Sequence, residues 1–419
     1  MKKKFLLMVP AICLLSACNN SENTPEEPDV NPQPTVTDLS ADEMANCYIV
    51  RETGKYRFKA DNQFNLGAGL PVPPEINPVD ASLLWQTKQG AVRSVELVVE
   101  DDIPYVEFEV AHSEGNAVIA VYDADKKICW SWHIWMPLEE VMAVTSASGY
   151  EVMNMNLGAL NNNAGDASSY GLLYQWGRKD PFPAAATLTG NTSTVSAPMY
   201  DMDGTPVTIK NSDWYSSEDN TIEYSISNPL VCLSNMSQFR SSGDWLKDSD
   251  SDDTLWGYLG DGSEETVLKG KKTCYDPSPA GWRVPDSDVF NHFTFPGTYA
   301  WDFWDFNVWD ANADGDITLD DYNYGWHFMI NDESPMYFPA AARFDGSYAM
   351  LMGSVSGIWG NYWSCTPASS SYSSKTGMAV CALAFQVKDQ NGGEMITVSP
   401  SGLASRADAY SIRCVKDVE

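Results

Sequence analysis

The feature that most constrains the fold of this chain is a series of short strand-like runs between residues 44 and 136, with no helical stripe among them. The clearest example is GNAVIAVYDADKKICWSWHIWM at 115–136, in which two apolar runs flank the turn-forming DADKK. Because strand side chains alternate between faces, the second run collects one set on a single face: Ile128, Trp130, Trp132, Ile134 and Met136. These runs predict an N-terminal β-sandwich over residues 39–145. Trp130 and Trp132 are expected in its core, and a binding platform is the alternative.

The N-terminus indicates export. Residues 1–17, MKKKFLLMVPAICLLSA, combine three lysines, an apolar run too short to span a bilayer and small residues, as signal peptides do. LSAC at 15–18 resembles the lipobox of bacterial lipoproteins, in which Cys18 becomes the acylated N-terminus. An ordinary secretory signal that leaves Cys18 as a thiol is the alternative. Residues 18–38 are rich in proline and acid, which predicts a lipidated flexible tether. We therefore expect an outer-membrane lipoprotein exposed at the cell surface and held in the membrane by its lipid alone.

Charge and cysteine content restrict the partners. The formal net charge of −31 makes nucleic acid and anionic lipid surfaces poor partners, and leaves cations, neutral glycans and basic protein patches open. Seven cysteines remain after removal of the signal and acylation of Cys18: Cys47, Cys129, Cys232, Cys274, Cys365, Cys381 and Cys414. An odd number leaves at least one unpaired, and none has the CxxC spacing of a zinc knuckle or a redox pair. The pairing of the others stays open.

The stretch DANADGDITLDD at 310–321 has the spacing of a calcium loop. Gly315 at the sixth position permits the sharp bend. Three side chains would face the ion, a fourth residue would add its backbone carbonyl, a fifth would bind through water and a sixth would close the cage: Asp310, Asn312, Asp314, Asp316, Thr318 and Asp321. With no second loop and little helical periodicity nearby, we expect a structural clamp with a dissociation constant on the order of 0.1–1 mM. The alternative is an Asx-rich turn that only mimics the pattern.

Aromatic residues surround that loop. Trp301, Trp304 and Trp309 precede it and Trp326 follows it. Sugars stack on exposed tryptophan faces, so Trp301, Trp304 and Trp326 are candidate ligand-binding residues, although burial of these rings within the insertion is the favoured interpretation. A second candidate recognition segment is the Ser, Tyr and Gly-rich span 353–377, with a partner surface expected around Tyr372.

Beyond residue 150, short apolar pieces alternate with Gly, Asn, Ser and Pro, as in loop-rich globular domains. A hairpin turn is expected at DMDG, with Asp203 and Gly204 at its tip. The acidic run at 247–265 lacks calcium-loop spacing and is expected to be solvated. Signals for catalysis are weak, because the four histidines are scattered and HExxH, G-x-S-x-G and phosphate-loop motifs are missing from the sequence. We therefore expect a protein that is not an enzyme, although two carboxylates suited to glycoside hydrolysis could still converge.

A resemblance follows from motifs in the second half of the chain. In order from Asn154 to Val415 these are NMNLGAL, GLLYQWGRKDPFP, YDPSPAGWRVP, YFPAAARFDG, GNYWSCTP, ALAF and YSIRCV. Together they resemble the Fibrobacter succinogenes major paralogous domain of surface lipoproteins in Bacteroides-type bacteria. The resemblance implies a C-type-lectin-like α+β domain over 150–419 with a calcium-loop insertion at 301–326, so the expected fold class is mainly β with an α+β part. Where the family often has Cys in the DPCP turn, this chain has Ser278, which leaves the family's disulfide to Cys414 open.

Three functions remain open from the sequence. The leading hypothesis is a non-enzymatic adhesin, similar to a fimbrial tip, whose partners would be glycans, host or bacterial surface proteins, or pilus subunits. The alternative is a glycan-binding or glycan-degrading component of a polysaccharide uptake system. A purely structural envelope protein is the third.

Overall fold

Strands dominate the computed structural model, and the few helices are short. The fold class is therefore mainly β with an α+β part, as expected. The structure describes residues 35–61, 64, 70–191, 193–212, 220–234, 243–247, 252–258, 270–368, 377–388 and 393–417. The predicted signal peptide, the predicted lipidation site Cys18 and most of the predicted tether lie outside these ranges. No helix within them is long and apolar enough to cross a membrane.

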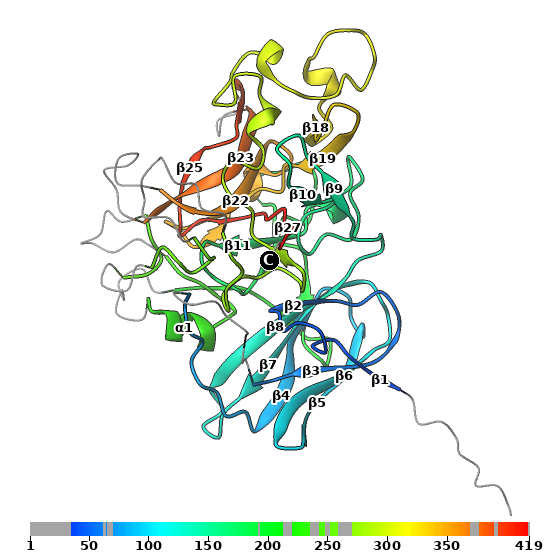
Figure 1. The fold of residues 1–419 in the computed structure, drawn as a ribbon, viewed down its shortest axis with the longest axis vertical. Helices are drawn as coiled ribbons and strands as arrows, with labels where there is room; N and C mark the ends of the chain where they lie inside the picture. The colour runs from blue at the N-terminus through cyan, green and yellow to red at the C-terminus, as the bar shows by residue number, and fades with distance from the viewer. Residues whose placement is uncertain are drawn as a thin grey trace, which may run out of the picture. The chain divides into compact units, whose positions relative to one another are not determined.

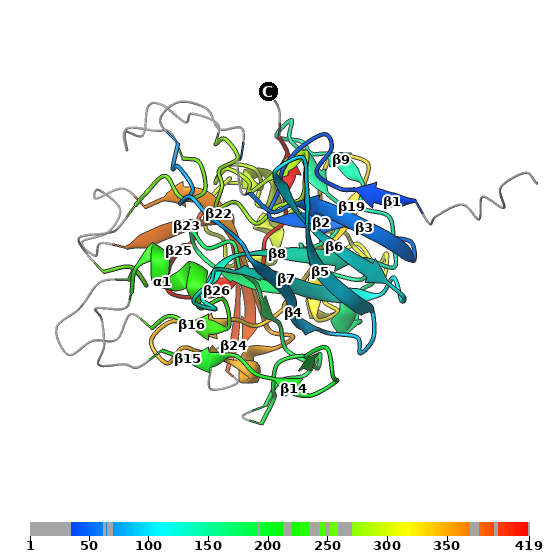
Figure 2. The same cartoon turned by 90° about the horizontal axis from the view of Figure 1, so that it is seen from below.

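Two sheets contain the N-terminal strands (Figure 1). The first has the order β1-β3-β6-β5, with β1 Val36–Asp38, β3 Gly54–Lys59, β6 Ile103–Val110 and β5 Val92–Glu100. The second has the order β14-β13-β4-β7-β8-β2, with β14 Pro206–Val207, β13 Met199–Tyr200, β4 Asp80–Gln86, β7 Gly115–Tyr122, β8 Ile128–Met136 and β2 Cys47–Ile49. Pairing is antiparallel except for β1 with β3 and β2 with β8. Figure 2 shows these strands from below.

The predicted tether ends earlier than residue 38. Residues 36–38 form β1, which pairs with β3 in parallel. The carboxylate of Asp38 forms an ion pair with the guanidinium of Arg57, with an Oδ2–Nε distance of 3.4 Å. The backbone N–H of Leu39 donates to the carbonyl of Arg57. The sequence VTD has two β-branched residues, which suit a strand once a partner edge is available. The prediction was wrong for these three residues because composition alone does not reveal an open sheet edge.

The two sheets pack face to face as the predicted sandwich. The ring of Trp132 on β8 lies 5.0 Å from that of Phe58 on β3, and Phe58 also stacks on Tyr48. Trp130 and Trp132 are fully buried, so the expectation of core positions is confirmed and the platform alternative is excluded. Burial of this aromatic layer stabilises the sheet interface, since each ring removes a large apolar area from water.

The opposite face of β8 is buried as well. Trp135 donates its indole N–H to the carbonyl of Ala159, and the hydroxyl of Ser131 donates to the Asp180 carboxylate at 2.6 Å. The ammonium of Lys179 completes this network, with Ser131 and Asp180 as acceptors. The largest apolar core accordingly draws residues from both sides of the predicted boundary near 145–150, and Val36–Glu419 form one compact unit.

His133 on this face predicts a pH dependence of stability. Its Nε2 lies 2.8 Å from the Oδ1 of Asn116, whose amide nitrogen donates to Gly158, so Nε2 carries the proton. Burial lowers the pKa of His133 to about 3. Below pH 6.5 the imidazole of His133 is therefore protonated in the unfolded chain but stays neutral in the folded chain. The free energy of unfolding falls as the pH falls toward 3. At pH 5 the loss is about 2 kcal/mol relative to pH 7.5.

The substitution His133→Gln keeps a donor toward Asn116 and removes the titration. We expect urea unfolding between pH 7.5 and pH 5 to show a shallower loss of stability for this variant than for the wild type, whatever its absolute stability. The exposed His112→Gln is the matched control and should retain the wild-type dependence. Equal pH dependence for His133→Gln and wild type would contradict the assignment.

The rest of the described residues form five further sheets. One is β17-β27-β10-β9, with Trp282–Arg283, Val415–Lys416, Glu151–Met153 and Ala143–Thr145. Another is β12-β11-β26-β20-β21, with Phe182–Pro183, Leu172–Gln175, Ala409–Tyr410, Phe344–Asp345 and Met350–Leu351. A third joins β22 Trp359–Pro367, β23 Met378–Lys388, β24 Glu394–Ser399 and β25 Leu403–Ser405. Two pairs complete the set: β15 Lys210–Asn211 with β16 Val231–Cys232, and β18 Gly325–Met329 with β19 Pro335–Pro339.

Helical elements are single turns or little more. The α-helix α1 spans Ile222–Ser227, and Thr221 caps it by accepting from the N–H of Tyr224. The 3-10 turns are η1 Ala167–Ser169, η4 Asn291–Phe293, η5 Phe303–Asp305, η6 Leu319–Asp321 and η7 Gly353–Val355. The hairpin predicted at DMDG is confirmed: it joins β13 to β14, and Gly204 has the positive φ of 82° that its turn requires.

The seven cysteines that follow Cys18 are all free thiols, and all but Cys129 are buried. Cys414 has a specific neighbour, because its Sγ lies 3.2 Å from the hydroxyl oxygen of Ser278.

Candidate functional site

The segment 291–330 supports the candidate site. It ends in β18, and its part before β18 lies above β18 and β19 in Figure 1, coloured yellow-green to yellow. Backbone hydrogen bonds hold it at several points. The N–H of Phe295 donates to Asp305, that of Asn307 to Phe293, and that of Met329 to Asn307. Under this frame the rings of Phe293 and Phe328 stack at 4.4 Å within a core that also holds Phe306 and Trp326. The surface residues of the segment therefore stand on a packed base.

The predicted calcium loop is closed by hydrogen bonds from its own backbone. The carboxylate of Asp310 accepts from the N–H of Gly315 at 2.8 Å. Asn312 and Asp314 each accept from the residue two positions on, at 2.9 Å in both cases. Gly315 adopts φ 93°, as the bend at the sixth position requires.

Asp321 closes the loop from its far end. One carboxylate oxygen accepts from the N–H of Ala311 at 2.9 Å, and the other accepts from the N–H of Thr318 at 3.0 Å. The hydroxyl of Thr318 in turn accepts from Asp320, so Thr318 and Asp321 form a capping box at the start of η6. The twelfth position is thus tied by hydrogen bonds to the second position of the loop.

The fit of this loop to a metal is partial. All its donors are the hard oxygens that calcium takes, and the Oδ1 of Asp310 is buried without a hydrogen-bond partner. A buried carboxylate oxygen without a partner is costly, and a cation would satisfy it. Within the described ranges, however, no three or more His, Cys, Asp or Glu side chains are gathered as a metal site. The carboxylates of Asp310, Asp314 and Asp321 would have to draw together on binding, and calcium stays a prediction.

The candidate tryptophans divide into two groups. Trp301 and Trp304 are 68% and 82% exposed, and Trp309 is also exposed. Trp326 is fully buried on β18, edge-on to Tyr322 and Phe306. The prediction of Trp326 as a ligand-binding residue is therefore wrong, because its ring is part of the core that supports the loop. Packing, the favoured interpretation for the whole group, holds for Trp326 and fails for Trp301 and Trp304.

Two further aromatic side chains of the same segment are exposed. Phe295 and Tyr299 are 70% and 47% exposed, and the ring of Tyr299 lies 5.7 Å from that of Trp301. Sequence reasoning missed both, although the spacing FxxxYxWxxW at 295–304 could have identified them. The second predicted recognition residue, Tyr372, lies outside the described residues.

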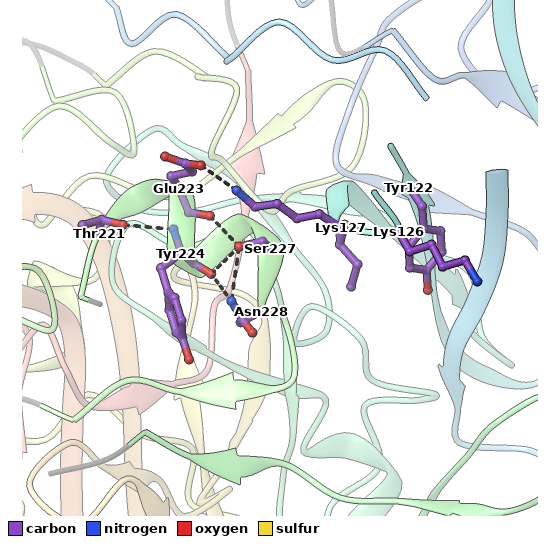
Figure 3. A pocket seen from close by; sticks show the side chains of 9 residues that line it. Tyr122, Lys126, Lys127, Thr221, Glu223, Tyr224, Ser227 and Asn228 are labelled. Carbon is purple, nitrogen blue, oxygen red and sulfur yellow. Dashed lines mark hydrogen bonds and ion pairs between the residues drawn. The ribbon is translucent and has the colours of Figure 1, made fainter. Parts of the chain in front are cut away.

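A groove of about 550 Å³ lies between α1 and the turn joining β7 to β8 (Figure 3). Lys127 reaches across it and forms an ion pair with Glu223 at 2.6 Å. The Ser227 hydroxyl donates to backbone carbonyls of α1, so it is held by its own helix. The ion pair neutralises both of its charged groups and no nucleophile stands beside a base among the lining residues, which gives this groove no evident chemistry.

No protein-family model, curated protein or solved structure matches the chain. The resemblance to the major paralogous domain, and the lectin-like fold that it implies, stay predictions.

Proposed function

We propose that the mature chain is a non-enzymatic lipoprotein of the outer membrane, displayed at the cell surface, that acts in adhesion or ligand binding, as a fimbrial tip does. The observation that carries this proposal is the set of exposed tryptophans, Trp301, Trp304 and Trp309, standing on a packed and hydrogen-bonded base. Large apolar side chains exposed together on a soluble protein mark interaction sites more often than chance. The lipid on Cys18 would anchor this surface to the membrane through the tether.

A bead assay tests this function. Beads coated with the mature protein are applied to panels of immobilised glycans, host glycoproteins and bacterial surface proteins. We expect retention on at least one surface, and loss of that retention in the double variant Trp301→Ala/Trp304→Ala. Both rings are exposed, so the variant should fold normally, which its unfolding curve checks. If beads coated with the variant were retained as well as those coated with the wild type, Trp301 and Trp304 would have no part in adhesion.

The alternative is a glycan-binding or glycan-degrading part of a polysaccharide uptake system, favoured by the same exposed tryptophans because sugar rings stack on them. Incubation of the mature protein with a polysaccharide panel decides between the two. Release of reducing ends from any polysaccharide would overturn the non-enzymatic proposal. Calcium-dependent sugar binding without hydrolysis would favour glycan capture over protein adhesion.

In this proposal calcium is a structural brace of the loop at 310–321. Its ligands would come from Asp310, Asn312, Asp314 and Asp321, from the backbone carbonyl of Asp316, and from Thr318 through water. Because the loop joins the exposed Trp309 to the buried Trp326, an ion there would stiffen the base of the aromatic surface. The support is the oxygen-only donor set and the buried, unpartnered Oδ1 of Asp310.

Calorimetric titration of the mature protein with calcium chloride should give a dissociation constant on the order of 0.1–1 mM, and 10 mM calcium should raise the free energy of unfolding by about 2 kcal/mol. Asp310→Asn keeps an acceptor for the N–H of Gly315 and removes the charge, and we expect it to abolish most of the binding heat. Asp203→Ala, on the exposed β13–β14 turn, is the matched control. Equal binding heats for the wild type and Asp310→Asn would show that Asp310 does not bind calcium and would contradict the predicted site.

A further inference from the structure

We propose that the exposed aromatic surface of residues 295–309 binds a basic, lysine- or arginine-rich segment of a partner protein. This inference rests on the proposed function and names the partner class for the same surface. The surface, called the tip surface from here on, consists of five exposed side chains: Phe295, Tyr299, Trp301, Trp304 and Trp309.

The tip surface is held in place by its backbone. Besides the bond between Phe295 and Asp305, the backbones of Thr294 and Phe306 form a β-bridge. Ala300 exchanges two backbone hydrogen bonds with Val398, at 2.8 and 2.9 Å. Trp309 donates its backbone N–H to His327. Rings presented on fixed backbone lose little conformational entropy when a partner arrives, which favours binding.

Charge around the tip surface selects the partner. From residue 284 to residue 342 the chain has no Lys or Arg and contains eleven Asp and Glu. Carboxylates alternate with the rings themselves, as in WDFWDFNVWD at 301–310, where Asp302 is exposed and Asp305 half-buried. Of these, Asp286 is neutralised by its buried ion pair with Arg283, and one bound calcium ion would offset two more. Anionic lipids and acidic glycans are therefore repelled, and a cationic partner is attracted over a Debye length.

Aromatic faces and carboxylates recognise cations together. The face of a tryptophan attracts an ammonium or guanidinium group through its quadrupole, and a neighbouring carboxylate adds a charge-assisted hydrogen bond. The apolar stems of Lys and Arg can lie along the same rings. A neutral sugar would use the rings but would gain nothing from the net negative charge. Exposed rings and exposed carboxylates in the same segment thus point to a basic peptide.

The test measures binding of a fluorescent twelve-residue peptide of alternating Lys and Ser to the full mature chain. A Glu–Ser peptide, cellohexaose and phosphatidylglycerol vesicles are the comparison probes. We expect binding of the Lys–Ser peptide alone, weakened at least tenfold between 50 and 500 mM NaCl. Trp301→Ala/Trp304→Ala should raise its dissociation constant about tenfold. Asp302→Asn should raise it about threefold.

Matched controls carry substitutions away from the tip surface. Val99→Ala on β5 removes an equally exposed apolar side chain, and Asp125→Asn in the β7–β8 turn removes an exposed carboxylate. Both should leave peptide binding unchanged. An unchanged dissociation constant in the double tryptophan variant would overturn the proposal, as would tighter binding of cellohexaose or vesicles than of the Lys–Ser peptide. Should bead adhesion depend on Trp301 and Trp304 while the basic peptide does not bind, the partner class is wrong and the proposed function stands.

Discussion

Replacing Asp286 with Ala is expected to lower the free energy of unfolding by about 3–5 kcal/mol, because it leaves a buried arginine without its main counter-ion. Asp286 and Arg283 are both 2% exposed, and their carboxylate oxygen and guanidinium nitrogen lie 2.7 Å apart. The other carboxylate oxygen accepts from the backbone N–H of Gly270 at 2.7 Å. Asp417 is a weak substitute partner, since it lies 3.8 Å from Arg283 and is partly exposed.

Guanidinium unfolding curves of the purified mature protein measure this loss. Asp286→Asn keeps the shape and an acceptor for Gly270 and removes the charge, so its loss should be smaller than that of the alanine variant. Glu114→Ala is the surface control: it breaks an exposed pair with Lys88 at 3.0 Å and should cost at most about 1 kcal/mol. A cost for Asp286→Ala no greater than that of Glu114→Ala would show that the pair contributes little.

The alternating pattern of residues 128–136 predicted the strand and one buried face, and the structure confirms both. It did not predict that the other face is buried too. Ser131 and His133 look like solvent-facing residues in a local pattern, yet inside the protein Asp180 accepts from the Ser131 hydroxyl and Asn116 pairs with the Nε2 of His133. Which segment covers a sheet is decided by chain far away in sequence. The one local signal was Trp135, a large ring on a face otherwise expected to be polar.

The candidate site shows the same division. Spacing predicted which residues would form the loop at 310–321, and the backbone bonds to Asp310 and Asp321 follow that register. Spacing did not separate Trp326 from Trp301 and Trp304, because all three are tryptophans beside acids and glycine. Trp326 is buried on β18, which pairs with β19, whereas Trp304 lies in the 3-10 turn η5, which has no buried residues. Residue type gives the chemistry, and only the tertiary pairing gives the exposure.

The second large predicted effect is a gain in stability from Ser278→Cys, because Ser278 lies beside Cys414. The two side chains are buried and their Oγ and Sγ atoms lie 3.2 Å apart, so Ser278→Cys should bring two sulfurs into bonding reach. The bridge would close a loop of 136 residues. Restricting the unfolded chain over so long a loop should raise the free energy of unfolding by about 2–4 kcal/mol under oxidising conditions.

Thiol titration and guanidinium unfolding, with and without reductant, measure this gain. The described chain of the wild type has seven free thiols. Oxidised Ser278→Cys should have six, since the new cysteine forms a disulfide with Cys414. Reductant should return its stability close to that of Ser278→Ala, the control that removes the hydroxyl without adding a sulfur. A variant that stays fully reduced in air, or one that is less stable when oxidised, would mean that the turn at 276–279 is held too rigidly for the sulfurs to close. In the wild type the same contact is a weak hydrogen bond worth about 1 kcal/mol or less. The packed core around Cys414 therefore holds this part of the chain without a bridge.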